Sequence, residues 1–374
     1  MDIAVSREAE ILARELEAAG YGRAVVLSEV PRVVRVAGRI CLDLADLEGG
    51  SIGADLARRD FTANALAVDL SAREWVDPFG GRRDIAARRL RLVREENFAD
   101  DPLRTLRAAR FFATHGLEPD ARTKRACRRF APMLSGVALE RIGAELSKLL
   151  GADRAGPAFD WARSAGLLPA ALGLEIGRRR LAVAARHLHR LDARLGRLVP
   201  RERRVIRLTA IADAAGLGAS ETAAWLRRRR LGRAEAAAAG RLVELVRNAA
   251  SESDAPSADW AWIYDADRLA PAALTLLPVL RPERASAALR IARRRRRGRR
   301  GPRITGEELM SWGALPPGPP IGELLREIGI AGLAGRIRTK PQARRWLSAR
   351  LSRPDGPGRA EVPKESRGKI RRRI

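Results

Sequence analysis

Cysteine and long apolar segments are scarce in this sequence of 374 residues, and both shortages exclude whole classes of protein. The two cysteines, Cys41 and Cys127, cannot form a disulfide framework and lack the spacing of metal ligands. We therefore expect a reducing compartment, the cytoplasm. The longest apolar stretch, residues 269–280, is interrupted by Pro271 and Pro278 and is shorter than the ~20 residues of a transmembrane helix, so no membrane partner is expected.

Aromatic residues are also rare, at 4% of a chain that is 46% hydrophobic. The cores must therefore be built mainly from alanine, leucine, valine and isoleucine. Such cores favour packed helices over sandwiches and barrels, whose strands are usually rich in aromatic and β-branched residues. The length allows two or three domains.

Acidic residues are too few to balance the basic ones. The chain has 72 lysines and arginines against 45 aspartates and glutamates, which gives a formal net charge of +27 and a pI near 11.5. A genome rich in arginine codons explains why arginine outnumbers lysine, but it does not explain the excess of both over the acidic residues. The excess predicts a polyanionic partner, with nucleic acid as the first candidate, because distributed arginines displace the counterions of phosphates.

The spacing of apolar residues changes near residue 101. Before this point, after an amphipathic helix at 7–19, short apolar runs predict strands at 24–27, 32–36, 39–44, 65–70 and 74–76. After it, apolar residues recur three and four apart, which predicts helices at 102–115, 120–133, 138–150 and beyond. The sequence thus predicts an α+β protein, with a mixed head before an all-helical remainder.

Two segments are predicted to lack regular structure. Residues 293–300 are nearly all arginine, and their mutual repulsion predicts a linker or an RNA-contacting loop. A solvated run of charge is the simpler interpretation of the same residues. Residues 352–374 have the composition of a disordered basic extension.

The densest chemical signal is the segment RRDFTANALA, residues 58–67. Two guanidiniums, Arg58 and Arg59, precede the carboxylate of Asp60 and the hydroxyl of Thr62, which can cap a short helical turn. The segment therefore predicts a rigid corner that binds anions. Taken alone, it is equally compatible with an ordinary capped helix and a surface ion pair.

Three further blocks follow this segment in order. They are WVDPFGG (75–81) with Asp84 downstream, DDPLRTLRAARF (100–111) and ERIGAE (140–145). In this order and spacing, the four blocks resemble those of class II template-independent RNA nucleotidyltransferases, the superfamily of tRNA CCA-adding enzymes and bacterial poly(A) polymerases. Residues 304–325 and 335–339 resemble the distal region of the same family, so the resemblance extends over almost the whole chain.

The resemblance implies a head with a polymerase-β-like nucleotidyltransferase fold, a mixed sheet with helices, followed by an all-helical neck, body and tail. We expect the head at 1–98, with its N-terminal part incomplete, and a neck that selects the base and binds RNA at 99–155. We expect a helical body at 156–292, a basic linker and helical tail at 293–351, and the basic extension at 352–374.

Base selection can be argued from hydrogen bonds made by Asp101 and Arg104. The two residues lie three apart at the start of a predicted helix, so both side chains can project from its end. A carboxylate accepts from the amino group of cytosine or adenine, and a guanidinium donates to the adjacent ring nitrogen. This pair suits CTP and ATP and rejects UTP and GTP. The simpler alternative is that Asp101 only caps the helix and that Arg104 is its salt-bridge partner.

The resemblance implies further nucleotide-binding residues, with Arg58 and Arg59 near the sugar and triphosphate. The full predicted set is Arg58, Arg59, Asp60, Asn64, Asp101, Arg104, Arg107 and Arg110.

The metal site is where the sequence departs from the family. Nucleotidyl transfer needs divalent ions, here Mg²⁺, held by clustered carboxylates. The resemblance implies that the segment MDIAV ends the strand of the family's Asp-x-Asp pair, with Asp2 at the second position; the first aspartate and a preceding glycine motif have no counterpart. Asp43 is the predicted third carboxylate of the family's metal site, and Asp46 is a neighbouring possibility for the same role. Asp2 and Asp43 are therefore the predicted catalytic residues and metal ligands. Asp2 as a frayed terminal residue and Asp43 as a strand end are the simpler interpretations.

Two explanations fit this departure. Translation begins upstream of Met1, which we favour, or the chain has lost its metal pair. We expect weak or no catalysis from the sequence as it stands.

The expected function is addition of C, A or both to tRNA 3′ ends from CTP and ATP, with release of pyrophosphate. The expected partners are the tRNA acceptor stem or other RNA 3′ ends. A poly(A) polymerase is the alternative with the same motifs, and a catalytically inactive RNA-binding protein is the alternative from another class.

Overall fold

The computed structural model describes residues 2–6, 8–29, 32–196, 198–251, 256–297 and 301–352. Its internal contacts divide the chain into two compact units, residues 1–243 and residues 244–374.

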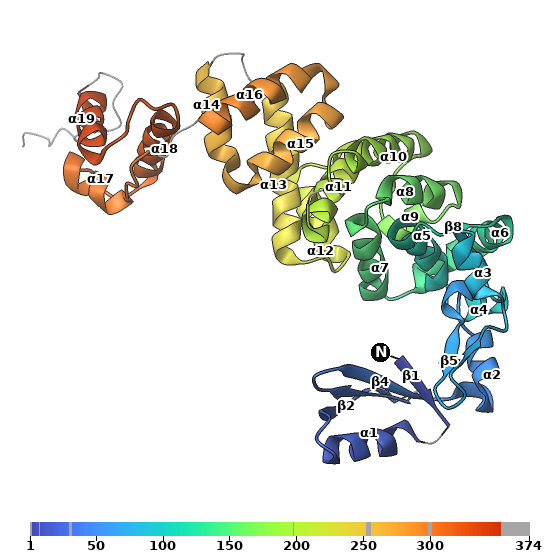
Figure 1. The fold of residues 1–374 in the computed structure, drawn as a ribbon. Helices are drawn as coiled ribbons and strands as arrows, with labels where there is room; N and C mark the ends of the chain where they lie inside the picture. The colour runs from blue at the N-terminus through green and yellow to red at the C-terminus, as the bar shows by residue number, and fades with distance from the viewer. Residues whose placement is uncertain are drawn as a thin grey trace, which may run out of the picture. The chain divides into compact units, whose positions relative to one another are not determined.

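The first unit begins with a four-stranded sheet and one helix (Figure 1). The strands lie in the order β1–β4–β3–β2, with β1 parallel to β4 and the other neighbours antiparallel. Along β3 the buried Val34 and Val36 alternate with exposed residues, so the sheet has one apolar face, and α1 packs on it. The elements are β1 (Asp2–Val5), α1 (Ala9–Ala18), β2 (Arg23–Glu29), β3 (Arg32–Ala37) and β4 (Cys41–Asp46).

Short elements connect this sheet to the helices that follow. The hairpin of β5 and β6 is antiparallel, and β7 pairs in parallel with β8, which follows two helices later in the chain. The elements are η1 (Glu48–Gly50), α2 (Ile52–Ala57), η2 (Thr62–Asn64), β5 (Ala67–Asp69), β6 (Glu74–Val76), α3 (Gly81–Ala86), β7 (Arg89–Leu90), α4 (Glu96–Asp100) and β8 (Glu118–Pro119).

The helices predicted after residue 101 are present. α5 (Leu103–His115) follows Pro102, whose φ of −60° suits a first turn, and ends at Gly116, whose φ of 68° lies in the left-handed region. Its apolar side, including Leu106 and Ala109, is fully buried. The helices that follow are α6 (Ala121–Phe130), η3 (Ala131–Gly136), α7 (Leu139–Gly151), α8 (Ala155–Ser164), α9 (Leu168–Leu172), α10 (Arg178–Asp192), α11 (Pro200–Ala215) and α12 (Ala219–Arg228).

The described part of the second unit is helical. The indole of Trp262 is buried and donates to the carbonyl of Leu245 at 3.0 Å, while Leu309, Leu324 and Leu347 form a separate apolar cluster. The helix α13 (Arg233–Ser251) crosses the boundary between the two units. It is followed by α14 (Pro256–Ala266), η4 (Asp267–Leu269), α15 (Ala270–Leu280), η5 (Pro282–Arg284), α16 (Ala285–Arg297), α17 (Gly306–Gly313), α18 (Pro319–Leu333) and α19 (Lys340–Leu351).

The α+β prediction is confirmed, but the predicted loop in the arginine run is wrong where the structure describes it. Residues 293–297 continue α16, and only residues 298–300 of that segment lie outside the described residues. Repulsion along the helix is reduced because Arg290 and Arg294 both pair with the buried carboxylate of Asp259. The predicted disordered extension lies outside the described residues beyond Ser352.

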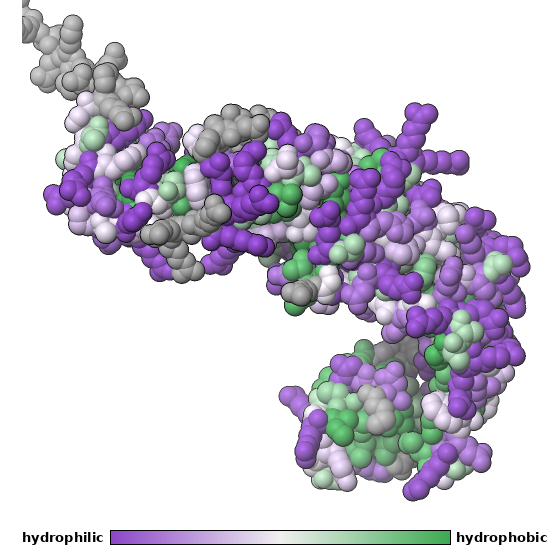
Figure 2. Space-filling view, turned by 45° about the horizontal axis from the view of Figure 1, so that its top comes forward, coloured by the Kyte–Doolittle hydropathy of each residue, from purple (hydrophilic) through white to green (hydrophobic). Residues whose placement is uncertain are grey.

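The predicted five-part domain division stays a prediction. The boundary between the two compact units falls at 243/244, inside the segment predicted as the body. Within the described residues, no helix combines the length and the apolar character needed to cross a membrane. Hydrophilic side chains cover most of the helices in Figure 2, and hydrophobic ones gather on the region of the N-terminal sheet.

Candidate active site

The anion-binding corner predicted at residues 58–59 is built around one buried carboxylate. Arg58 and Arg59 follow the end of α2 and pair with the two oxygens of Asp55 at 2.9 and 2.8 Å. Burial alone would raise the pKa of Asp55, but hydrogen bonds from the two arginines lower it below its ordinary value. Both arginine side chains remain 41% exposed. The corner therefore presents two fixed guanidiniums that can still reach an anion.

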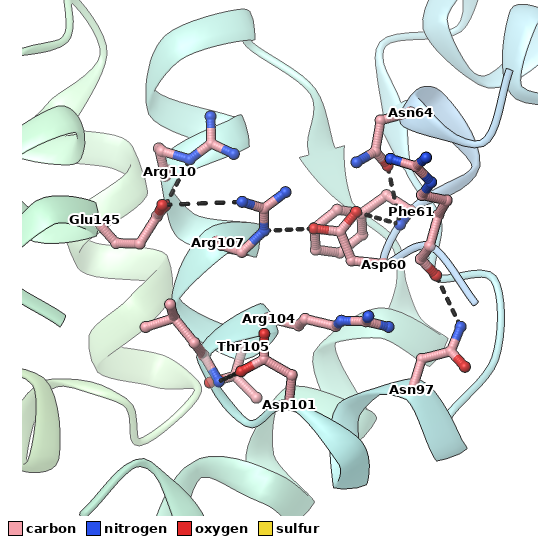
Figure 3. A network of polar contacts seen from close by, with 12 residues as sticks. Asp60, Phe61, Asn64, Asn97, Asp101, Arg104, Thr105, Arg107, Arg110 and Glu145 are labelled. Carbon is pink, nitrogen blue, oxygen red and sulfur yellow. Dashed lines mark hydrogen bonds and ion pairs between the residues drawn. The ribbon is translucent and has the colours of Figure 1, made fainter. Parts of the chain in front are cut away.

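Two side chains from later in the chain hold the backbone of this corner (Figure 3). The amide of Asn97 donates to the carbonyls of Ala57 and Arg59 at 2.9 and 2.7 Å. Arg104 Nη1 donates to the carbonyl of Arg58 at 2.7 Å. The predicted base-reading arginine is thus joined directly to the predicted triphosphate-binding residues. Asn97 was not among the predicted site residues, because an asparagine in a helical stretch gives no local sign of a partner 40 residues away.

Three more of the predicted residues form a buried chain of ion pairs (Figure 3). Arg107 Nε donates to Asp60 at 2.6 Å, and Arg110 Nε donates to Glu145 at 2.6 Å. Arg107 Nη1 also lies 3.9 Å from Glu145, which joins the two pairs. Asp60 and Glu145 are only 3% and 4% exposed. This chain connects the corner segment to α5 and α7, so the partners of these residues are internal to the protein.

Asn64 and Thr62 shape the turn that follows the corner. Asn64 Oδ1 accepts from the backbone N–H of Phe61 at 3.2 Å, and Thr62 Oγ1 donates to Asp84 at 2.7 Å. Asp84 is fully buried and also receives Arg89 and Arg91. Burial alone would raise the pKa of Asp84, but the hydrogen bonds from Thr62 and the two arginines lower it. Asn64 therefore has a structural partner here, and Asp84 is the charged centre beneath the turn.

The glycine turn packs directly against this centre. Gly80 has a φ of 72°, in the left-handed region, and Asp77 accepts from the backbone N–H of Gly81 at 2.7 Å. A Cβ on Gly81 would lie 2.0 Å from the carbonyl oxygen of Thr62. Gly81 is therefore required by the close approach of the turn to the segment at 58–67, whereas Gly80 is favoured by its left-handed backbone conformation.

The predicted base-reading pair lies at the start of α5, but its members are not partners of each other among the described contacts. Asp101 accepts from the backbone N–H of Leu103 at 3.3 Å and from Arg141 Nη2 at 2.8 Å. Arg104 is instead directed to the Arg58 carbonyl, and its burial lowers the pKa of its guanidinium. The alternative in which Arg104 is the salt-bridge partner of Asp101 is therefore wrong, while the capping contact it also assumed is present.

The predicted metal ligands share one face of the sheet. Asp2 on β1 lies directly beside Asp43 on β4 in the parallel register, so both side chains point to the face opposite α1. Arg35 donates to both oxygens of Asp43 at 2.6 and 2.7 Å, and these bonds lower the pKa of that carboxyl. Asp46 lies on the other face and accepts from the backbone N–H of Ala9 at 2.6 Å. Its position therefore disfavours Asp46 as the third ligand.

The donor set at Asp2 and Asp43 fits a hard divalent cation. Two adjacent carboxylates supply oxygen ligands, and Mg²⁺ commonly takes one or two carboxylates together with water and substrate phosphates. No group of three or more potential metal ligands occurs among the described residues. A metal at this position would therefore depend on oxygens from water and nucleotide to complete its coordination.

Comparison with known families matches two segments of the chain. Residues 3–91 match the family model described as Poly A polymerase head domain. Residues 116–172 match the model described as Probable RNA and SrmB- binding site of polymerase A. The first segment contains nearly all of the sheet and the corner, and the second contains the helices from α6 to α9.

Relatives extend the similarity to nearly the whole chain. A CC-adding tRNA nucleotidyltransferase of Geobacter sulfurreducens is 32% identical over 391 aligned residues, which cover 95% of this chain and 89% of that protein. A CC-adding tRNA nucleotidyltransferase of Synechocystis is 43% identical over 133 residues, covering 35% of this chain and 32% of that protein.

Solved structures agree with this similarity. The Bacillus stearothermophilus CCA-adding enzyme in complex with CTP matches with a TM-score of 0.70 and 26% identity, covering 93% of this chain and 88% of that one. The Thermotoga maritima CCA-adding enzyme complexed with tRNA has the same fold, with a TM-score of 0.69 at 20% identity, covering 94% and 86%.

The head sheet, the corner and the helical remainder define a nucleotidyltransferase of the template-independent class. Within that class, the chain belongs to the family of tRNA nucleotidyltransferases and poly(A) polymerases, because its similarity to the Geobacter protein spans both chains almost completely.

Proposed function

We propose that this protein adds C, A or both to the 3′ end of tRNA, with CTP and ATP as donors and pyrophosphate as the leaving product, and that CTP is the preferred donor. The observation that carries the proposal is the contact of Arg104 with the arginine corner: one hydrogen bond joins the predicted base-reading side chain to the predicted triphosphate-binding segment. The similarity to a CC-adding enzyme over nearly the whole chain supports cytidine as the preferred nucleotide.

The nucleotide would be held at both of its ends. Arg58 and Arg59 offer exposed guanidiniums to the phosphates, which they can bind with bidentate geometry. Asp101 would accept from the N4 amino group of cytosine while Arg104 donates to N3. Uracil places a carbonyl and an N–H at these two positions, so the same pair disfavours UTP.

Asp2 and Asp43 would hold Mg²⁺ in this reaction. When bound, the metal supplies charge neutralisation at the departing pyrophosphate and lowers the pKa of the attacking 3′-hydroxyl. The hydrogen bonds from Arg35 lower the pKa of Asp43, which favours its charged form, and a bound metal would take the place of this arginine. The remaining residues orient the nucleotide and the RNA end. We further propose that the protein works in the cytoplasm, where tRNA and nucleoside triphosphates are available.

Incorporation of single labelled nucleotides into tRNA that ends before its CCA sequence tests this proposal. In keeping with the weak catalysis expected from the sequence, we expect CTP to be incorporated slowly, UTP and GTP to be rejected, and addition to stop after one to three nucleotides. Long tracts of A on an unrelated RNA would identify a poly(A) polymerase instead. A folded protein that binds tRNA yet incorporates no nucleotide would identify an inactive RNA-binding protein. Arg104→Ala is the variant that tests base reading, because the ratio of incorporated CTP to UTP must change if Asp101 and Arg104 read the base.

A further inference from the structure

A pocket of about 580 Å³ opens on the second unit, along the helices α14 and α16. Its volume lies within the ~300–1,000 Å³ that is usual for small-molecule sites. Trp260 of α14 forms part of the wall. The residues of α16 that complete it recur three and four apart and so form one face of that helix: Ser286, Leu289, Arg290, Arg293 and Arg294.

The pocket combines apolar surface with a basic rim. Leu289 is 63% exposed, whereas the core side of α16 is formed by Ala287, Ala288 and Ile291, which are buried. Trp260 is only half-buried, in contrast to the fully buried Trp262 of the same helix. Both side chains therefore offer apolar surface to the pocket. A helix face that served only to carry solvated charge would not need an indole or an exposed leucine.

Among the ion pairs of the described residues, the basic groups of the pocket outnumber the acidic ones. Asp259, 3% exposed, receives Arg290 Nε at 2.9 Å and Arg294 Nε at 2.8 Å, so one carboxylate faces two guanidiniums. Arg293 is exposed and has no acidic partner within the part of the chain that the structure describes. The surplus positive charge makes an anionic ligand the favoured occupant.

We infer that this pocket binds one unpaired nucleotide of the RNA substrate, with the base stacked on Trp260 and a phosphate on Arg293. The inference rests on the proposed function, because that function makes RNA the ligand. Every base offers a flat π-face to an aromatic side chain, and the adjoining phosphate offers the charge that the arginines require. An acidic protein segment would satisfy the arginines but would leave the face of the indole unused.

Equilibrium binding of tRNA that lacks its 3′ end tests the basic part of the pocket. Arg293→Ala is compared with Arg295→Ala, which removes the same charge from the same helix outside the pocket. We expect Arg293→Ala to weaken binding about three- to tenfold more than Arg295→Ala and to lower the salt dependence by about one phosphate contact. Equal effects of the two substitutions would show that tRNA binding depends only on the general positive charge of the helix, and they would overturn the inference.

The stacking part is tested with Trp260→Leu and Trp260→Phe, with the unfolding temperature of each variant as a check on folding. We expect Trp260→Leu to weaken tRNA binding about tenfold and Trp260→Phe to retain most of it, because phenylalanine keeps an aromatic face. Heparin, a polyanion without bases, should bind Trp260→Leu as well as the unsubstituted protein. If Trp260→Leu leaves tRNA binding unchanged, or weakens heparin binding equally, the pocket does not recognise a base.

Failure of this inference can be distinguished from failure of the proposed function. If the unsubstituted protein incorporates CTP and the pocket variants bind tRNA normally, only the pocket assignment is wrong. If it incorporates no nucleotide while the pocket variants lose tRNA binding, only the proposed activity is wrong.

Discussion

Two groups of carboxylates at the candidate site lie in opposite environments. Asp2 and Asp43 lie beside each other on the uncovered face of a sheet, where Arg35 is the described partner of Asp43. Asp60 and Glu145 are almost completely buried and are joined to arginines of α5. An accessible carboxylate can exchange its arginine for a cation, whereas a buried pair that loses a member leaves an uncompensated charge. The first group is therefore suited to chemistry and the second to holding the helices in place.

The largest expected effect tests the accessible group. Asp43→Asn removes the charge needed for Mg²⁺ but preserves the shape, so nucleotide incorporation should fall by more than about 100-fold, since even residues behind metal ligands contribute 10–100-fold. The unfolding temperature should change little, because exposed ion pairs stabilise weakly.

The matched control for that variant is Asp46→Asn on the same strand. It makes the same change of charge on the other face of the sheet, where the amide oxygen can still accept from Ala9. Incorporation should stay near the unsubstituted rate. Equal loss in both variants would contradict the assignment of Asp43 as a metal ligand.

The next effect tests, through stability, another buried carboxylate that is paired with arginines, Asp84. Asp84→Ala leaves Arg89, Arg91 and Thr62 without their shared acceptor, and we expect a loss of about 3 kcal/mol in the free energy of unfolding. Urea denaturation measures this loss. Asp69→Ala, which removes an exposed carboxylate from a turn, serves as the comparison and should change the midpoint far less. A small effect at Asp84 would show that the buried charges are dispensable for folding.

The preference for CTP over UTP distinguishes a residue of α5 that reads the base, Arg104, from one that only positions the site, Arg107. Arg104→Ala should reduce the preference for CTP over UTP by about ten- to a hundredfold, the range of one lost bidentate or paired base contact. Arg107→Ala should lower the overall rate through its lost pair with Asp60 while leaving the CTP-to-UTP ratio near its original value. The ratio of CTP to UTP incorporation is measured with both nucleotides competing in one reaction. An unchanged ratio in Arg104→Ala would remove base reading from this residue.

A smaller effect is expected at Asn97, which holds the backbone of the arginine corner. Asn97→Ala loses two hydrogen bonds of about 1 kcal/mol each, and the corner becomes less well ordered for triphosphate. We expect the KM for CTP to rise about three- to tenfold with kcat little changed. A fall in kcat at constant KM would instead indicate that Asn97 acts after the nucleotide has bound.

The smallest effect concerns acid stability. The folded pKa values of Asp55 and Asp84 are lowered, so their contribution to stability is complete above the unfolded pKa of about 4 and is lost as the pH falls through the lower folded values. The unfolding midpoint should therefore be nearly constant from pH 7 to 5 and fall below pH 4. Asp84→Asn should flatten that fall; an equally steep fall would show that other groups carry the acid sensitivity.

Some of the site was visible in the sequence because it depends on local spacing. The segment at 58–67 and the start of α5 are found where they were predicted, since caps, turns and helix starts are set by residues within a few positions. Asp55, Asn97 and Arg141 were not predicted. Each is a common polar residue whose importance arises from a partner, and two of them act on residues about 40 positions away.

In the arginine run, by contrast, a prediction was made from the sequence and was wrong. Charge repulsion within residues 293–300 predicted an irregular segment, but Asp259, from another helix, offsets part of that repulsion and residues 293–297 are helical. The carboxylate of Asp259, which lies 31 positions before Arg290 and further still before Arg294, could not be assigned to these arginines from the sequence.

The sequence by itself determined the α+β class, the change from strands to helices near residue 101 and the four ordered blocks, because these depend on local periodicity and spacing. Only the tertiary structure decided which charges are neutralised internally and which remain accessible. In the structure, Arg104 donates to the backbone of the corner and Arg141 donates to Asp101. Asp46 lies on the covered face of the sheet, where it accepts from Ala9. Electrostatic partners are chosen by distance in space, and folding brings together residues whose separation along the chain carries no such information.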